Sequence, residues 1–429
     1  MVQVRTALSI EEAISKTMID DVSQPTETVA LMDSLNRFLA KDILATEHVP
    51  AFDRALYDGY AIRAADTILA TKENPIEVEV IETIGAGSTF SESVQPFQAV
   101  RIMTGAEIPA SCDAVVMLED VSEYKHNGKM KIAISKVVQS GERIFKRGSE
   151  LKKGMTIGRQ GAQITPGLIG LLATFGFHKV AVKKKPVVGV LATGSELLNI
   201  DEPLVAGKIR NSNSYMLMSQ IEQAGGEAVD LGKLEDNLEK SVEVIKGALQ
   251  RVDILMTTGG VSVGDFDYLP SIYARLNATV LFNKIAMRPG SVTTVAKLGA
   301  QYLFGLSGNP SASFIGFELF VRPVIHQRLG SSIPHLLAVQ ARLGEDYLTP
   351  NNFTQIIRMK LVVECGEISV VSNGLNMSNS ITSLAGADAL AILPPTTKGY
   401  RKGDLVDVLL LTMQKGQENS VFGGDQDDN

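Results

Sequence analysis

Cysteine is scarce in this chain of 429 residues. The two cysteines, Cys112 and Cys365, lie far apart in the sequence. This spacing provides neither a disulfide framework nor the ligand spacing of a zinc site. We therefore expect a protein of a reducing compartment, the cytoplasm.

Long apolar stretches are also lacking. The longest one, residues 167–177, is far shorter than the roughly 18 residues that a transmembrane helix needs. Near the N-terminus, the acids Glu11, Glu12, Asp20 and Asp21 stand where a signal peptide would be basic and apolar. We expect neither a membrane segment nor secretion.

Positive charge is in deficit as well. The formal net charge is -7, and nucleic-acid binding requires a basic face, so we expect no nucleic-acid partner. The sequence contains neither a Walker A motif nor a G-x-G-x-x-G fingerprint, so ordinary P-loop and dinucleotide folds are not indicated. The apolar content of 45% and the charged content of 21% are those of a globular protein, and the length predicts roughly three domains.

The N-terminal part predicts helices followed by β structure. Ser9 and Glu12 form an S-x-x-E capping box ahead of a helical pattern, and residues 31–39 show a second one. From about residue 47 the apolar period changes to two, and Asn127-Gly128 is a strong hairpin signal. Residues 47–145 thus predict a small barrel or sandwich, inserted between the ends of a helical element.

The basic run before Pro186 marks a domain boundary, after which strand and helix patterns alternate. We expect strands at 187–191, 227–231 and 254–258, and helices at 213–224, 238–250, 268–275 and 311–328. This alternation predicts a doubly wound, mostly parallel sheet, whose ligands bind beyond the carboxyl ends of the strands. Residues 331–412 are again β-like, with the clearest strands at 353–365 and 405–411, and residues 413–429 have the composition of a disordered tail.

Three glycine-rich polar turns follow strands or precede helices of this sheet, at residues 193–197, 258–267 and 307–311. Glycine lets a backbone approach a ligand closely and expose its N–H groups, which can cradle a phosphate. In the third turn, Asn309 is placed as a helix N-cap and Pro310 as the first helical residue. Each turn taken alone equally fits a structural role, because strand-to-helix turns need glycines and caps.

Acidic residues are expected beside these turns. Glu196, Asp236 and Asp267 would converge there with the basic Lys284 and Arg288. Carboxylates next to a phosphate repel it unless a divalent cation intervenes, so this mixture indicates Mg²⁺ held by few carboxylates and by ligand oxygens. Each acid taken singly is also compatible with an ordinary solvated surface charge.

An ordered series of motifs gives these turns a more specific meaning. The motifs are FDR…DGYA at 52–61, MTGA at 103–106, RGSE at 147–150, TGSEL at 193–197, TTGGVSVGDFD at 257–267, RPG at 288–290, GNPSAS at 308–313 and ITSLAGADAL at 381–390. In this series the sequence resembles the MoeA family of molybdopterin molybdotransferases, to which the E domain of gephyrin is also similar. The resemblance covers nearly the whole chain.

The resemblance implies a multidomain fold of α/β and β parts. Residues 1–185 would form a mixed helical region with the inserted β domain, 186–330 a MogA-like doubly wound α/β domain that binds molybdopterin, and 331–412 a C-terminal β-barrel. It also implies an elongated homodimer, whose site lies between the α/β domain of one subunit and the N-terminal β region of the other.

The resemblance further implies a reaction. The family takes adenylylated molybdopterin and molybdate, cleaves the adenylate with the help of Mg²⁺, and releases molybdenum cofactor and AMP in the cytoplasm. Other proteins of molybdenum cofactor biosynthesis are possible partners. Two alternatives remain open: the preceding adenylyltransferase step, which shares the MogA-like domain, and a non-catalytic scaffold like gephyrin. The choice between molybdate and tungstate is open too.

Site residues are carried over by motif position. Catalytic roles are implied for Asp58, Thr104, Glu150, Glu196, Asp236 and Asp267, with Glu196, Asp236 and Asp267 as metal ligands. Ligand binding is implied for Thr193, Gly194, Gly259, Gly260, Ser262, Lys284, Arg288, Gly308, Asn309 and Pro310. The chain departs from the family pattern at Glu150, usually aspartate, at Arg288, usually lysine, and at Ser291, where the family has a second lysine.

Overall fold

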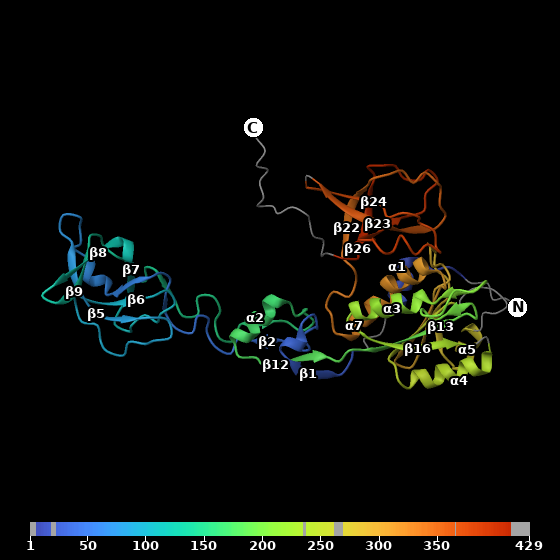
Figure 1. Ribbon diagram of the computed structural model, residues 1–429, viewed down its shortest axis with the longest axis horizontal. Coiled ribbons are helices and arrows are strands. Elements are labelled where there is room, and N and C mark those ends of the chain that lie inside the picture. Colours follow the sequence, from blue (N-terminus) through green and yellow to red (C-terminus); the bar gives the residue numbers. More distant parts are fainter. Residues whose placement is uncertain (1–5, 19–22, 235–236, 261–268, 365, 413–429) are drawn as a thin grey trace. The chain divides into compact units, whose positions relative to one another are not determined.

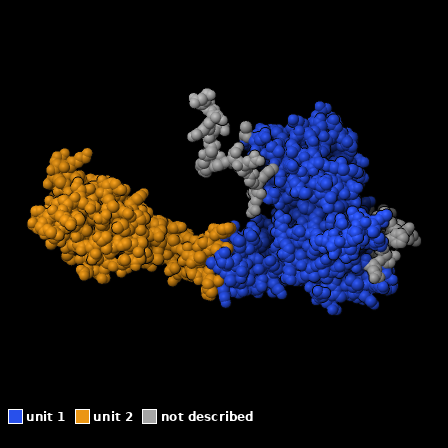
Figure 2. All heavy atoms as spheres, viewed as in Figure 1, with its two compact units in different colours: residues 1–41, 160–165, 179–429 blue, residues 42–159, 166–178 orange. Residues whose placement is uncertain are grey.

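The computed structural model describes residues 6–18, 23–234, 237–260, 269–364 and 366–412. The chain forms two compact units, one of residues 1–41, 160–165 and 179–429, and one of residues 42–159 and 166–178 (Figure 2). The expected tail, 413–429, and three candidate site residues, Asp236, Ser262 and Asp267, lie outside the described residues. The first unit is called unit 1 and the second unit 2.

Unit 1 contains the expected doubly wound sheet. Its strands stand in the order β16 (Glu227–Leu234), β13 (Val187–Thr193), β17 (Ile254–Thr258), β21 (Gln301–Leu306), β20 (Thr294–Leu298) and β18 (Thr279–Phe282). The first four strands are parallel, and β20 and β18 are antiparallel additions at one edge. The α/β prediction is therefore confirmed.

Helices cover both faces of this sheet (Figure 1). One face carries α3 (Ser212–Gln223), α6 (Pro310–Gly316) and α7 (Arg322–Arg328), and the other carries α4 (Leu238–Leu249) and α5 (Leu269–Arg275). Neighbouring side chains of a strand point to opposite faces, so Val190 packs with the first group of helices and Leu191 with the second. Both faces of the central strands are thus buried, as a parallel sheet requires.

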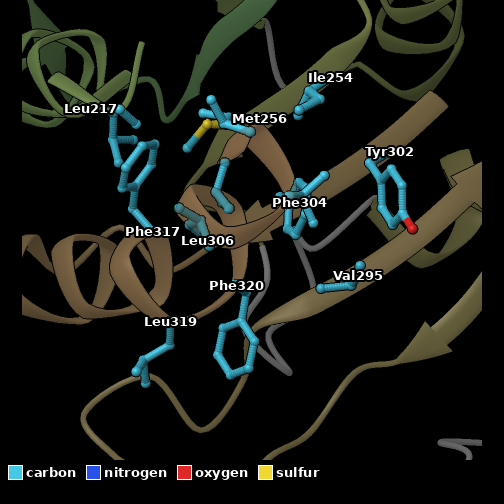
Figure 3. Close-up of a cluster of buried hydrophobic side chains, with 14 of the residues drawn as sticks. Leu217, Ile254, Met256, Val295, Tyr302, Phe304, Leu306, Phe317, Leu319 and Phe320 are labelled. Carbon is cyan, nitrogen blue, oxygen red and sulfur yellow. The ribbon is translucent and has the colours of Figure 1, made fainter. Parts of the chain in front are cut away.

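The larger of these cores lies under α3 and α6. Leu217 of α3, Met256 of β17 and Phe304 of β21 meet there with Phe317 and Phe320 (Figure 3). The segment from α6 to α7 is helical, as expected for residues 311–328, but Phe317–Val321 form a π-helical stretch, η4. Pro323 lies just beyond it and has no N–H to give to a preceding carbonyl, which explains a wider turn at this point.

The C-terminal part of unit 1 is a closed five-stranded barrel, as expected. Its strands are β22 (Ala338–Leu343), β23 (Thr354–Glu364), β24 (Glu367–Ser372), β25 (Ala389–Leu393) and β26 (Leu405–Leu410). They pair in the ring β23-β24-β22-β26-β25, which closes between β25 and β23. A two-residue strand of the α/β part, β19 (Met287–Arg288), pairs with β23, so the barrel is joined to the α/β part by backbone hydrogen bonds.

Unit 2 contains the expected β domain, as a six-stranded sheet. Its order is β7 (Ala114–Met117), β4 (Gly59–Ile62), β6 (Gln98–Ile102), β5 (Ile76–Ile84), β9 (Lys129–Ile134) and β8 (Val121–His126). The hairpin at Asn127-Gly128 is confirmed: both residues have positive φ, 52° and 79°, as a type I′ turn requires. Apolar side chains are buried on both faces of the sheet.

Short elements complete the two units. They are β1 (Thr26–Ala30) with β12 (Lys179–Lys183), β2 (Ile43–Leu44) with β11 (Thr156–Gly158), β3 (Arg54–Ala55) with β10 (Ile144–Phe145), β14 (Leu197–Leu198) with β15 (Ile209–Arg210), the 3₁₀ turns η1 (Met32–Ser34), η2 (Ala64–Thr67) and η3 (Leu118–Asp120), and α2 (Pro166–Thr174). Within the described ranges no helix is long and apolar enough to cross a membrane.

Of the two helices expected near the N-terminus, one forms and the other does not. The capping box of Ser9 and Glu12 forms in full and begins α1 (Ile10–Thr17). The second helix, expected at residues 31–39, is wrong, because only the 3₁₀ turn η1 forms there. The backbone N–H groups of Asn36 and Leu39 instead donate to carbonyls of residues 162–164, so pairing with a distant segment overrides the local helical pattern.

Candidate functional site

The three expected turns of unit 1 meet at one edge of the sheet. They follow β13, β17 and β21, which are parallel neighbours, so their carboxyl ends lie side by side. The Thr193 hydroxyl donates to the Thr258 carbonyl at 3.2 Å, and the Gly259 N–H donates to the Leu306 carbonyl at 2.9 Å. We call residues 193–197, 258–260 and 307–311 the turn cluster.

Glycines are required at the centre of the turn cluster. Gly259 has φ +92° and Gly260 has φ +67°, values that residues with a side chain rarely adopt. A Cβ at Gly259 would lie 2.5 Å from Thr193 Oγ1 and 2.8 Å from the Thr193 carbonyl oxygen, inside van der Waals contact. The close approach of the two turns therefore depends on the missing side chain.

A buried asparagine that our sequence analysis missed ties two of these turns together. The Asn213 side-chain amide donates to Thr258 Oγ1 at 3.0 Å and to the Gly308 carbonyl at 2.8 Å. Asn213 is 9% exposed, and none of the residues that the structure describes donates a hydrogen bond to its buried Oδ1. The sequence did contain a signal for Asn213. It stands four residues before Leu217, on the apolar stripe of α3, where a polar side chain is unusual and indicates a buried hydrogen-bonding role.

Glu196 lies in the first turn and is exposed to solvent. Its carboxylate folds back over Gly194, where an added Cβ would come within 2.4 Å of Glu196 Oε2. Two ammonium groups hold the backbone of this turn: Lys208 Nζ donates to the Ser195 carbonyl at 2.5 Å, and Lys233 Nζ to the Leu197 carbonyl at 3.0 Å. Two lysine side chains thus hold the backbone on both sides of Glu196, while its carboxylate stays exposed.

The turn after β21 adjoins a cavity of about 600 Å³ that extends to the barrel. Its lining includes Arg288, Ser291, Ser307, Asn309, Asn376 and Ser378. The Arg288 guanidinium lies 5.1 Å from the centre of the Phe353 ring, a cation–π contact that restrains it. Lys284, expected beside Arg288, does not belong to this lining, and its carbonyl accepts a hydrogen bond from the Leu8 N–H.

The expected cap of α6 is only partly correct. Asn309 does precede the helix and Pro310 is its first residue, but the Asn309 side chain makes no capping hydrogen bond. Its amide nitrogen instead lies 3.4 Å from Ser378 Oγ, in the barrel part of the unit. The Asn309 side chain therefore connects the turn cluster with the barrel instead of capping α6.

In unit 2 the structure brings together Asp58 and Thr104, two residues predicted from separate motifs. Asp58 Oδ1 accepts hydrogen bonds from the Thr104 N–H and from the Thr104 hydroxyl, both at 2.7 Å. These two bonds, the backbone one foremost, hold the pKa of the Asp58 carboxyl below its ordinary value. Both side chains are exposed, so the ionised carboxylate is open to a ligand.

The three motifs of unit 2 contact one another through the segment that contains Asp53 and Ala55. The Ala55 N–H donates to the Ala106 carbonyl at 3.0 Å, and Gly105 returns a bond to the Ala55 carbonyl. Asp53 accepts from the Arg147 N–H at 2.8 Å and from Lys146 Nζ at 2.9 Å. Glu150 is exposed near these residues in sequence, and its N–H donates to the Val49 carbonyl.

Comparison with known proteins identifies the family. Residues 3–176 match the MoeA N-terminal region (domain I and II), 189–327 a probable molybdopterin binding domain, and 340–411 the MoeA C-terminal region (domain IV). The chain is 50% identical to the molybdopterin molybdenumtransferase of Bacillus subtilis over 97% of both chains. It belongs to the MoeA family.

Further MoeA relatives agree with this assignment. The molybdopterin molybdenumtransferase of Staphylococcus epidermidis is 44% identical over 98% of this chain and 100% of its own. A crystal structure of the molybdopterin biosynthesis MoeA protein from Pyrococcus horikoshii matches with a TM-score of 0.81 and 30% identity, covering 94% of this chain and 99% of the other. The resemblance seen in the sequence is thus confirmed at the level of family and fold.

The metal set expected from the MoeA resemblance is described only in part. Of its three acids, Glu196 is described, whereas Asp236 and Asp267 are not. In the part of the chain that the structure describes, no group of three or more His, Cys, Asp or Glu side chains is placed to hold a metal ion. Mg²⁺ commonly binds through one or two carboxylates and completes its shell with water and substrate oxygens, so the exposed Glu196 carboxylate suits it.

Proposed function

We propose that this chain is a molybdopterin molybdenumtransferase, which inserts molybdate into adenylylated molybdopterin and releases AMP. The observation that carries this proposal is the match over the whole chain, from the N-terminal region to the barrel, to relatives with that name. An adenylyltransferase would need only the MogA-like α/β part. The turn cluster and the Asp58–Thr104 pair supply the polar groups that such a reaction needs.

The turn cluster is proposed to hold the phosphate side of the substrate. The missing side chains of Gly259 and Gly260 let the turns after β13 and β17 lie close together. Glycine-rich turns of this kind can offer backbone N–H groups to phosphate oxygens. Thr193, Gly194 and Gly308 belong to the same cluster. Ser262, Asp236 and Asp267, which lie outside the described residues, remain proposed members of the site.

Molybdate is proposed to meet Arg288 in the cavity beside the turn cluster. A guanidinium can donate two parallel hydrogen bonds to an oxyanion, which a lysine ammonium cannot do. The contact with Phe353 restrains Arg288, so less rotamer freedom is lost on binding. The Ser291 side chain also lines this cavity, as a hydroxyl where the family usually has a lysine.

Mg²⁺ is proposed to be held by Glu196 with Asp236 and Asp267. When bound, it would supply positive charge for phosphate and molybdate oxygens as the adenylate leaves. Glu196 keeps its carboxylate exposed, and the Lys208 and Lys233 contacts keep its backbone in place. Arg288 adds a permanent positive charge that does not depend on a cation.

We also propose that the protein acts as a homodimer, in which the Asp58–Thr104 pair of one subunit serves the turn cluster of the other. Mixed dimers test this arrangement. Asp58→Asn and Glu196→Gln should each inactivate a homodimer, because each removes a charge at nearly constant shape. A mixed dimer of the two variants should recover one intact site, and complete inactivity would contradict the shared site.

The direct test of function is AMP release from adenylylated molybdopterin by the purified protein with Mg²⁺, with and without molybdate. Release that depends on molybdate, together with active cofactor, is the expected result. ATP consumption with free molybdopterin would favour the adenylyltransferase alternative, and bound substrate without release would favour the scaffold. Repeating the assay with tungstate determines which oxyanion the site prefers.

The matched variant for this assay is Glu196→Gln. We expect at least about a hundredfold loss of AMP release, because the proposed cation loses a ligand charge. Its thermal unfolding should equal that of the wild type, since the Glu196 carboxylate is exposed. Wild-type turnover by this variant would reject a charge or metal role for Glu196.

A further inference from the structure

Arg358 carries a buried positive charge, and it belongs neither to the turn cluster nor to the lining of the cavity. It lies in β23 of the barrel and is 1% exposed. Among the described residues, no carboxylate lies within ion-pair distance of its guanidinium, whereas charged groups inside proteins are normally paired. Burial lowers the pKa of Arg358 to about 10, which still leaves it protonated at neutral pH.

Two of the three guanidinium nitrogens, Nε and Nη2, bond to one short stretch of the barrel. Nε and Nη2 donate to Ser383 Oγ at 3.3 and 3.0 Å, and Nη2 also donates to the Met377 carbonyl at 3.0 Å and the Leu375 carbonyl at 3.4 Å. We call residues 375–383 the barrel segment. Its backbone lies outside the strands of the barrel, so these bonds to Arg358 replace the ladder bonds that a strand would have.

The barrel segment also reaches the turn cluster. Asn376 and Ser378 line the cavity together with Ser307 and Asn309 of the turn after β21. At the start of α6, the Ser311 N–H donates to the Ser378 carbonyl at 3.2 Å.

The buried Ser311 hydroxyl makes a second bond, to the Ser380 carbonyl at 2.6 Å. Hydrogen bonds at both ends, joined by the backbone of the barrel segment, therefore connect Arg358 to the turn that follows β21.

We propose that Arg358 is a positioning residue, which fixes the barrel segment so that the cavity keeps its shape and the turn after β21 keeps its place. This inference rests on the proposed function. An arginine suits the role because two of its nitrogen atoms, Nε and Nη2, hold the Ser383 hydroxyl while Nη2 also reaches the two carbonyl groups, whereas a lysine offers a single nitrogen atom. Among the described residues, these neutral acceptors are what compensates the buried charge.

Arg358→Met and Arg358→Lys test the role, with Arg342→Met as the matched control. Arg342 belongs to the same barrel but is half exposed, and it donates to the Gly403 carbonyl and faces Glu367 at its surface. For both Arg358 variants we expect kcat/KM for molybdate to fall at least about tenfold, because misplacement of binding groups is costly. The KM for adenylylated molybdopterin should change less than about threefold, and the control should behave as wild type.

Hydrogen exchange separates positioning from general destabilisation. In the Arg358 variants, exchange should become faster in residues 375–383 and at 307–311, whereas β25 and β26 should keep their protection. Full rescue by lysine would show that charge alone suffices and would overturn the proposal. An unchanged KM and kcat for molybdate, in a variant with faster exchange of the barrel segment, would overturn it as well.

A second variant keeps the test decisive if the Arg358 variants do not fold. Ser311→Ala removes the hydroxyl bond to Ser380 from the opposite end of the connection and leaves Arg358 intact. It should raise the KM for molybdate by about three- to fivefold, in line with the loss of one hydrogen bond; an unchanged KM would contradict the connection. If the wild type itself releases no AMP with molybdate, the proposed function fails, while the exchange experiment still decides whether Arg358 orders the barrel segment and the turn.

Discussion

The two groups of site residues are built on different principles. In the turn cluster of unit 1, close backbone contacts and a buried amide fix the geometry, since Gly259 approaches Thr193 and Asn213 bridges two turns. In unit 2, an exposed carboxylate, Asp58, is fixed by two short hydrogen bonds from one residue, Thr104. The first group should therefore be sensitive to added atoms and to cavities, and the second to the loss of one donor.

Gly259→Ala should have the largest effect. The new Cβ would collide with the Thr193 hydroxyl and carbonyl, and the φ of +92° is strained for alanine, so the turns after β13 and β17 must separate. We expect AMP release to fall at least about a hundredfold, because the site needs these turns within a fraction of an ångström of their place.

The control for this prediction is Gly247→Ala. Gly247 lies within α4, and a Cβ there would meet nothing within 4 Å, so alanine should leave activity unchanged and stabilise the helix by roughly 0.5–1 kcal/mol. Thermal unfolding and AMP release are to be measured on both variants. Wild-type activity in Gly259→Ala would mean that the close approach of the turns is not needed.

The sequence already predicts much of both groups, the turn cluster of unit 1 and the Asp58–Thr104 pair of unit 2. Strand and helix periodicity locates the α/β sheet, and glycines after parallel strands must come together at its carboxyl edge, which is where the turn cluster lies. The motif resemblance also named both Asp58 and Thr104, which the structure joins by hydrogen bonds. In both cases, a local pattern and the topology agree.

The residues missed by the sequence analysis depend on distant contacts. The place of Asn213 on the apolar stripe of α3 marks it as unusual, but its partners are known only once α3 is seen to place it against turns that are far away in the chain. Arg358 stands in a strand pattern that says nothing of its burial, and its partners come from a later, irregular segment. The wrong helix at residues 31–39 has the same cause, because its backbone pairs with residues 162–164.

Asn213→Ala should reduce AMP release less than Gly259→Ala does. It tests whether the turn cluster is sensitive to a cavity as well as to an added atom. It removes two donated hydrogen bonds and leaves a small buried gap, so we expect about 1–3 kcal/mol less free energy of unfolding. AMP release should fall about tenfold or more, because the turns after β17 and β21 lose their bridge. Denaturant unfolding and the same assay measure both quantities.

Ser219→Ala in the same helix is the control for Asn213→Ala. The Ser219 hydroxyl is exposed, and its partner among the described residues is the Tyr215 carbonyl of the same helix. Its removal should therefore change neither stability nor activity beyond a few tenths of a kcal/mol. Equal effects of the two substitutions would show that Asn213 acts merely as a helix residue and not as a bridge between turns.

Thr104→Val should have the smallest effect, since it removes one of the two donors to Asp58 and keeps the backbone N–H. The pKa of Asp58 should rise toward its ordinary value of 3.8, measurable by NMR titration of the carboxyl carbon. A depressed folded pKa stabilises the protein above the unfolded value, and this contribution is lost as the pH falls through the folded pKa. The variant should therefore lose part of this contribution at pH 7, and its stability should approach that of the wild type as the pH falls through the folded pKa of Asp58.

Asp53 is the internal control in that titration. Its pKa is also lowered: partial burial acts to raise it, but the Arg147 N–H and the Lys146 ammonium outweigh that, and Thr104 takes no part. Asp53 should thus titrate alike in both proteins, while Asp58 moves. Because Asp58 stays ionised at pH 7 in either case, activity should fall only about two- to fivefold, through looser positioning of the carboxylate. A shift of Asp53 together with Asp58 would instead point to a rearranged unit 2, and the separate hydrogen-bond control of Asp58 would be wrong.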